Sequence, residues 1–198
     1  MIEIEKKFAL TKENSDKLIK DAAFLSERVF TDTYYDNDKY ELTTKDTWLR
    51  MREGKFELKI PLKENKERIV DQYTEIEDEN EIRKALKIPK EKELTEDLQK
   101  AGYKEFCTCK TTRRKYKKET FTIDLDMVEY DGYTYHIGEI ELMAENETQA
   151  KEALNKIIAF AKKHKISFMP VRGKVVEFLR LNNQDHYKAL VKAGVVKE

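Results

Sequence analysis

Long apolar segments are absent from this sequence of 198 residues, and 39% of its residues are charged. No run approaches the roughly 20 apolar residues that a membrane-spanning helix needs, and the chain begins with a strand pattern instead of a signal sequence. We therefore expect a cytoplasmic protein without a membrane partner. Net charge is also absent, because 39 basic residues balance 39 acidic ones, so composition gives no reason to expect nucleic acid as a partner.

Cysteine and histidine are scarce, which argues against several kinds of catalytic site. The two cysteines, Cys107 and Cys109, have no second cluster of Cys or His to complete a zinc site, so we expect reduced thiols without an assigned role. The three histidines, His136, His164 and His186, are dispersed along the chain. We expect packing or surface roles for them, and no protein nucleophile.

What the sequence has in abundance is a strand pattern with one charged and one apolar face. In the first ten residues, Ile2, Ile4 and Phe8 alternate with charged residues, and a period of two places the two sets on opposite faces of a strand. One such strand is ordinarily half-buried with a solvated outer face. The pattern returns, however, in residues 47–52, 55–61, 73–77, 121–128 and 137–142.

Between these strands, changes in periodicity predict helices that cover the apolar face. Helices are expected over residues 12–22, 78–86, 95–101, 147–164, 175–181 and 185–193. A further strand, rich in Thr and Tyr, is expected over residues 30–36. No low-complexity linker interrupts the chain, so we predict one domain over residues 1–198, with a C-terminal helical segment at about 173–194.

The charges on the predicted strands are sorted by sign. Like charges group as Glu3 with Glu5, Asp124 with Asp126, Glu139 with Glu141, Arg50 with Arg52, and Arg113 with its basic neighbours. Like charges two residues apart on a strand repel, so they are kept at a cost unless something of opposite sign lies between them. Carboxylate clusters suit Mg²⁺ or Mn²⁺, and arginine clusters suit phosphates. Together they predict a metal-bound polyphosphate as ligand.

The fold that accommodates this pattern is α+β. We predict a closed antiparallel barrel of eight strands with a charged interior, covered outside by helices. Closure leaves no sheet edge unpaired, and a barrel of about eight strands has room for side chains or one small ligand.

The ordered set of charged motifs resembles the CYTH, or triphosphate tunnel metalloenzyme, superfamily. Glu3-Ile4-Glu5-Lys6-Lys7 is similar to the Glu-x-Glu-x-Lys signature of that superfamily. The resemblance continues through Thr33-Tyr34-Tyr35-Asp36, Leu49-Arg50-x-Arg52, Glu57-Leu58-Lys59, Arg113, Asp124-x-Asp126, Gly138-Glu139-x-Glu141 and Gly173-Lys174. A lone Glu-x-Glu-x-Lys is a weak signal because charged strands are common, whereas this ordered set covers nearly the whole chain.

The resemblance implies a Mg²⁺-dependent triphosphatase, with Mn²⁺ as an alternative metal and a small-molecule triphosphate as partner. The residues implied to clamp the triphosphate are Lys7, Arg50, Arg52, Lys59, Arg113 and Lys174. Those implied to hold one or two metal ions are Glu3, Glu5, Asp124, Asp126, Glu139 and Glu141. We favour Arg113 over the adjacent Arg114 as the inward residue, because Tyr116 follows three residues later as in the family. Thr111 stands where many members carry a second basic residue.

Within the superfamily, the chain most resembles the thiamine triphosphatases. Trp48 directly before Leu49-Arg50, the pair Tyr73-x-Glu75 and the tail over residues 184–190 are similar to those enzymes. The resemblance implies that Trp48 stacks on the thiamine rings and that Tyr73 and Glu75 hold the organic part of the substrate. A packing role is the alternative for Trp48, since aromatic residues mostly serve packing.

Three other functions stay open. An inorganic tripolyphosphatase needs no aromatic platform, a class IV adenylate cyclase forms cyclic AMP from ATP, and a non-catalytic module binds polyphosphate without turnover. The full set of acidic pairs argues against the binding module, because binding an anion alone favours fewer carboxylates. We expect the protein to be a monomer.

Overall fold

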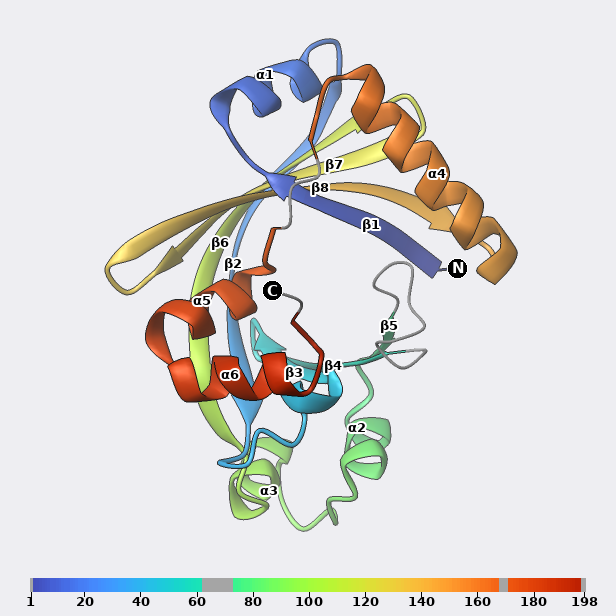
Figure 1. Ribbon diagram of the computed structural model, residues 1–198. Coiled ribbons are helices and arrows are strands. Elements are labelled where there is room, and N and C mark those ends of the chain that lie inside the picture. Colours follow the sequence, from blue (N-terminus) through green and yellow to red (C-terminus); the bar gives the residue numbers. More distant parts are fainter. Residues whose placement is uncertain (1, 62–72, 168–170, 197–198) are drawn as a thin grey trace. The chain divides into compact units, whose positions relative to one another are not determined.

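The computed structural model describes residues 2–61, 73–167 and 171–196, and it shows eight strands and six α-helices in these residues (Figure 1). In chain order the elements are β1 (Ile2–Ala9), α1 (Lys12–Ile19), β2 (Ala23–Asp36), the 3₁₀ turn η1 (Thr43–Lys45), β3 (Trp48–Arg52), β4 (Lys55–Pro61), β5 (Tyr73–Ile76), α2 (Glu79–Leu86), α3 (Leu94–Lys100), β6 (Lys104–Lys118), β7 (Phe121–Tyr130), β8 (Tyr133–Ala144), α4 (Glu147–Lys163), α5 (Lys174–Asn182) and α6 (Gln184–Lys192). The predicted α+β class is confirmed. None of the described helices is long and apolar enough to cross a membrane.

The strands are hydrogen-bonded in the order β1-β8-β7-β6-β2-β3-β4-β5. The registers that are described, from β1 with β8 to β4 with β5, are antiparallel. Eight antiparallel strands are therefore confirmed. Closure of these strands into a barrel stays a prediction, because the order ends at β1 and β5 in the described residues.

The described residues fall into two compact units. The first consists of described residues in 2–29 and 110–174, and the second of those in 30–61, 73–109 and 175–196. The long strands β2 and β6 contribute residues to both units. The expected C-terminal helices are present as α5 and α6, while a single domain over the whole chain stays a prediction.

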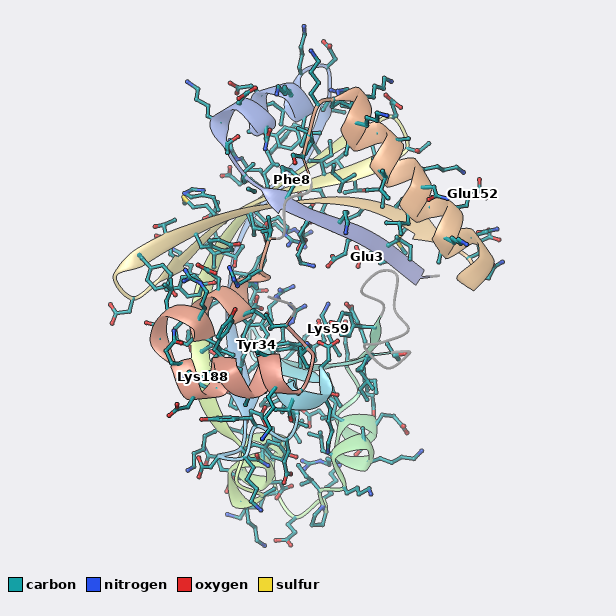
Figure 2. The ribbon with its side chains drawn as sticks, in the orientation of Figure 1. Glu3, Phe8, Tyr34, Lys59, Glu152 and Lys188 are labelled. Carbon is teal, nitrogen blue, oxygen red and sulfur yellow. The ribbon has the colours of Figure 1, made fainter. Side chains whose placement is uncertain are left out.

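The first unit buries the apolar face of its strands under helix α4. This helix packs against β1 and β8, and Ile4, Phe8, Ile140 and Ile157 belong to the same buried cluster. Figure 2 shows Glu3 on the side of β1 away from α4. Covering one face with a helix leaves the charged face of the same strands for a ligand.

The second unit has its own core, in which α2 packs against β4. Leu49, Leu58 and Ile82 lie in one buried cluster. Arg83 of α2 and Asp97 of α3 form a buried ion pair, with Nη1 and Oδ2 2.6 Å apart. This pair fixes the two helices to each other. The face of β3 and β4 that carries Arg and Lys lies outside this core.

The boundary between α1 and β2 corrects the prediction from sequence. Thr11 caps the helix as expected, with its Oγ1 accepting from the backbone N–H of Asn14 at 3.1 Å. The helix was expected to reach residue 22 but ends at Ile19, and Asp21 takes a positive φ of 60°. Strand β2 then begins at Ala23, well before the expected start at residue 30. Residues 23–29 are mostly exposed, so they lack the apolar alternation that marks the other strands.

Gly138 is required by close packing on the apolar face of the first unit. It lies directly opposite Phe8 in the pairing of β1 with β8. A Cβ atom at this position would overlap the ring of Phe8, which is fully buried. The glycine of the Gly138-Glu139 motif therefore has a structural reason, and its acidic neighbour is positioned by the strand.

Replacing Gly138 by alanine is expected to lower the free energy of unfolding by about 1–3 kcal/mol, because the added Cβ would force the buried ring of Phe8 to shift. Urea denaturation measures the change. The matched control is Gly173→Ala, since a Cβ there meets its nearest neighbour, Cε of Lys7, only at 4.0 Å. Equal losses in the two variants would contradict the packing argument.

His186 on α6 is fully buried in an aromatic cluster of the second unit. Its ring stacks on Tyr40 with centroids 3.9 Å apart and meets the edge of Phe106 at 4.9 Å. Its Nε2 lies 2.6 Å from Oγ1 of Thr43. Burial lowers the pKa of His186 to about 4, although the Asp36 carboxylate acts in the opposite direction.

The neutral state of His186 predicts a loss of stability in acid. A histidine in an unfolded chain has a pKa of about 6.5. Between pH 6.5 and about pH 4, His186 is therefore protonated in the unfolded chain but not in the folded one. We expect His186→Gln to flatten the decline of the unfolding free energy over this range, measured by urea denaturation at stepped pH. His136→Gln is the control, because His136 is exposed. An unchanged slope in His186→Gln would refute the assignment.

Candidate active site

The six predicted metal ligands are brought together on one face of β1, β7 and β8 in the first unit. This carboxylate face consists of Glu3, Glu5, Asp124, Asp126, Glu139 and Glu141. In the pairing of the strands, Glu5 lies opposite Glu141, and Asp124 lies opposite Glu139. Side chains opposite each other on neighbouring strands are in contact distance, so alternation along each strand and register between strands together build the face.

Glu5, Glu139 and Glu141 form its centre. Each offers a carboxylate oxygen, and these oxygens lie within 4.8 Å of one another. Twice the Mg²⁺–oxygen distance of about 2.1 Å gives roughly 4.2 Å across an octahedral magnesium site, so the spacing fits a small divalent cation. The all-oxygen donor set is the one that such hard cations prefer.

Burial destabilises the ionised form of Glu5 and Glu141. Burial, followed by repulsion from Asp124, raises the pKa of Glu141 to about 9. Burial, followed by repulsion from Glu139, raises the pKa of Glu5, although Lys7 acts in the opposite direction. The set therefore favours a bound positive charge, which a proton or a metal ion can supply.

Arg113 on β6 already neutralises another part of the carboxylate face. Its Nη1 lies 2.5 Å from Oδ2 of Asp124, its Nε donates to Asp126 at 2.7 Å, and its Nη2 donates to Glu139 at 3.1 Å. Burial alone would lower the pKa of Arg113, but the bonds to Asp126 and the charge of Glu139 raise it. Arg114 is exposed, whereas Arg113 lies on the carboxylate face.

Lys115 is a residue of this face that the sequence reasoning missed. Its Nζ lies 3.2 Å from Oδ2 of Asp124 and 3.4 Å from Oε2 of Glu141. Because it is two residues beyond Arg113 on the same strand, alternation alone could have found it. Arg113 and Lys115 thus both form ion pairs with aspartates of β7. Glu3, at the edge of the face, is exposed.

Lys7 and Lys174 lie at the same carboxylate face. Lys7 bonds to Glu5, and its Nζ is 3.7 Å from Glu139. The segment that carries Lys174 is held by tyrosines of the β7–β8 hairpin, since the Tyr130 hydroxyl donates to the carbonyl oxygen of Lys174 at 2.7 Å. The Tyr135 hydroxyl likewise donates to the carbonyl oxygen of residue 172 at 2.8 Å.

The side chain of Lys174 reaches Thr111 on β6. Its Nζ donates to Oγ1 of Thr111 at 3.4 Å, and Thr111 is fully buried. The ammonium group of Lys174 also acts on Asp126, whose pKa burial raises despite Arg113. Lys174 therefore supplies positive charge beside a strand position that has none of its own.

The remaining predicted residues gather on one face of β3, β4 and β5 in the second unit. This arginine face consists of Trp48, Arg50, Arg52, Lys59, Tyr73 and Glu75. The register places Trp48 opposite Lys59, and Lys59 opposite Glu75. Lys59 also bonds to Glu75, and its side chain is labelled in Figure 2. An aromatic ring, a cation and a carboxylate thus form one row across three strands.

The carboxylates of buried Asp32 and half-buried Glu57 hold the two arginines of this face. Arg52 donates through Nε and Nη2 to the two oxygens of Asp32, at 2.7 and 2.9 Å. Nη2 of Arg50 lies 2.6 Å from Oε1 of Glu57. Sequence reasoning did not assign Asp32 or Glu57 to the site. Alternation predicts the face of the strand on which each lies, but only the pairing of strands shows that they contact Arg52 and Arg50.

Comparison with known proteins gives a family and a fold. The CYTH domain family matches residues 1–167 of the chain. Thiamine-triphosphatase of Homo sapiens is 27% identical over 222 residues, which cover 100% of this chain and 93% of that protein. Thiamine-triphosphatase of Macaca fascicularis is 27% identical over 224 residues, with the same coverage of 100% and 93%.

Among solved structures, a protein from Pyrococcus horikoshii OT3 is similar with a TM-score of 0.61 and 23% identity, covering 90% of this chain and 98% of that one. A putative adenylyl cyclase from Hippeastrum, described as having a dominant triphosphatase activity, has a TM-score of 0.55 and 16% identity, covering 88% and 93%. At these identities the structures establish a shared fold.

The contrast between Arg113 and Arg114 gives a direct test of the carboxylate face. Arg113→Gln leaves Asp124, Asp126 and Glu139 with less positive charge, so we expect it to lower the free energy of unfolding by about 3 kcal/mol. The matched control, Arg114→Gln, removes an exposed charge from the adjacent position and should change stability by less than about 0.5 kcal/mol. Urea denaturation without added metal measures both, and a reversed order would show that Arg114 serves the carboxylates.

Proposed function

The chain belongs to the CYTH domain family, and on this basis we propose that it is a metal-dependent triphosphatase that converts thiamine triphosphate to thiamine diphosphate and phosphate. The observation that carries the proposal is the cluster of Glu5, Glu139 and Glu141 with cations at the same face. The choice of thiamine triphosphate is supported by the 27% identity to thiamine-triphosphatase of Homo sapiens, which spans the whole chain.

We propose Mg²⁺, or Mn²⁺, as the metal at the carboxylate face. Glu5, Glu139 and Glu141 would hold it, with Glu3, Asp124 and Asp126 as further candidate ligands. In support, Oδ1 of Asp124 is buried and finds no hydrogen-bond donor among the described residues. When bound, the ion supplies positive charge at the phosphoryl oxygens as a Lewis acid.

The role proposed for the cations is to bind the triphosphate and to stabilise the charge that builds up as the terminal phosphate leaves. Lys7, Arg113 and Lys174 would act from the carboxylate face, and Arg50, Arg52 and Lys59 from the arginine face. Phosphoryl transfer needs little covalent help from the protein, so positioning and fixed positive charge supply most of the acceleration. Water then serves as the nucleophile, in keeping with the absence of a Ser, Cys or His among the predicted site residues.

We further propose that the eight strands close into a tunnel with a charged interior. The order of the motifs along the chain and its membership of the family support this closure. Trp48 would stack on the thiamine rings, with Tyr73 and Glu75 holding the organic part. The proposed partner is this small molecule alone, and the proposed state is a monomer.

Phosphate release from thiamine triphosphate, inorganic tripolyphosphate and ATP, measured in parallel with Mg²⁺, Mn²⁺ or EDTA, tests the function. We expect preference for thiamine triphosphate and loss of release in EDTA. Preference for tripolyphosphate would keep the triphosphatase and remove the thiamine pocket. No release from any of the three would overturn the proposal, and cyclic AMP formed from ATP would identify a cyclase.

Glu139→Gln tests the metal ligands separately from the substrate. We expect Mg²⁺ affinity by isothermal titration calorimetry, and phosphate release, to fall by more than about 100-fold, since direct ligands exceed the about 10- to 100-fold effects of residues behind them. Stability without metal should not fall in proportion, because one of several repelling carboxylates is removed. Glu152→Gln on the exposed surface of α4 is the control, and a Glu139→Gln protein as active as wild type would remove Glu139 from the site.

A further inference from the structure

Asp46 connects two residues of the proposed thiamine pocket that are far apart in sequence. Its carboxylate accepts a hydrogen bond from the indole Nε1–H of Trp48 at 2.8 Å. It also accepts from the Tyr73 hydroxyl, whose oxygen lies 3.0 and 3.1 Å from the two carboxylate oxygens. One side chain therefore holds the ring that opens β3 and the ring that opens β5.

The surroundings of Asp46 make this contact rigid. Asp46 ends the turn η1 with a left-handed backbone, at φ 56° and ψ 30°. The residue is buried, with only 4% of its surface exposed. Hydrogen bonds to a charged acceptor are stronger than neutral ones, and their strength grows away from water. The orientation of the Trp48 ring is thus fixed before any ligand binds.

Trp48 stands at the end of a row of cations. Arg50 and Arg52 follow it at alternate positions of β3, so all three side chains share one face. With a rise of about 3.4 Å per residue, these two positions lie roughly 7 and 14 Å along the strand from Trp48. A molecule with a flat ring at one end and phosphates at the other matches this order of ring, then cations.

The charge of Asp46 also affects which ring the platform attracts. A negative group at the indole N–H increases the electron density of the ring, and a ring with greater electron density attracts a cation over its face more strongly. The same buried carboxylate attracts a cationic ring through space, since charges interact more strongly away from water. A neutral ring or an inorganic phosphate chain gains neither contribution.

We infer that Asp46 is a positioning residue, which fixes Trp48 and Tyr73 as one platform and makes that platform selective for triphosphates that carry a cationic aromatic ring. The inference rests on the proposed function, because it concerns the organic end of the same substrate. Asp46 itself is assigned no contact with the reacting phosphates.

Asp46→Asn isolates the charge from the geometry. Asparagine has the same shape, tolerates the left-handed backbone and can still accept from the indole, but it carries no charge. We expect the KM for thiamine triphosphate to rise about tenfold relative to the inhibition constant of inorganic tripolyphosphate, as loss of a charged hydrogen-bond partner predicts. Asp38→Asn, which removes an exposed partner of Lys104 in the same unit, should leave this ratio unchanged.

Tyr73→Phe tests whether the platform acts as a unit. It removes the hydrogen bonding of the Tyr73 hydroxyl to Asp46 and leaves the bond from Trp48, so the ratio should change in the same direction by a smaller factor. The double variant should show less than the sum of the two single effects, because interacting residues are not additive. Full additivity would show that Asp46 and Tyr73 act independently and would overturn the single platform.

Fluorescence gives a readout that does not depend on turnover, since Trp48 is the only tryptophan of the chain. Asp46→Asn should shift its emission and weaken its quenching by thiamine triphosphate about tenfold in ligand concentration, in line with the loss of a charged partner. Unchanged emission and quenching, or equal losses for thiamine triphosphate and tripolyphosphate, would overturn the role of Asp46. A wild-type protein that binds thiamine triphosphate without releasing phosphate would instead overturn the proposed function, and the quenching comparison would still decide on Asp46.

Discussion

Repulsion among buried carboxylates is the constraint on which the first unit depends. Glu5, Glu139 and Glu141 are brought within 4.8 Å of one another by strand register, and their burial raises the pKa of Glu5 and Glu141. Such an arrangement persists only where the rest of the unit compensates for it. The apolar cluster beneath α4 and the cations Arg113 and Lys115 supply that compensation. Their favourable free energy offsets the repulsion within a cluster that favours a positive ligand.

The second unit uses the opposite arrangement, in which carboxylates orient the cations and rings of the arginine face. Asp32 holds Arg52 through two hydrogen bonds, and Glu57 lies against Arg50. Asp46 does the same for Trp48. Side chains oriented in advance lose less entropy on binding, so these negative residues would favour the anion binding that we propose for this face.

Alternation predicted that Glu3 and Glu5 share one face and that Arg50 and Arg52 share one face, because a period of two is a local property of the sequence. It did not predict the first half of β2, where exposed residues lack that signal. Nor did it assign Asp32 or Asp46, because their partners are distant in sequence. Arg52 lies 20 residues from Asp32, and Tyr73 lies 27 residues from Asp46. Pairing across such separations depends on the register of the sheet, which a single sequence does not contain.

Thermal unfolding with and without a divalent cation tests the central claim most directly, because a ligand that binds only the folded state raises its stability. The account predicts that Mg²⁺ or Mn²⁺ raises the Tm of the protein, while NaCl at the same ionic strength does not. The effect should be absent in Glu139→Gln and preserved in Glu152→Gln. A Tm that is the same with Mg²⁺, Mn²⁺ and NaCl would contradict the account.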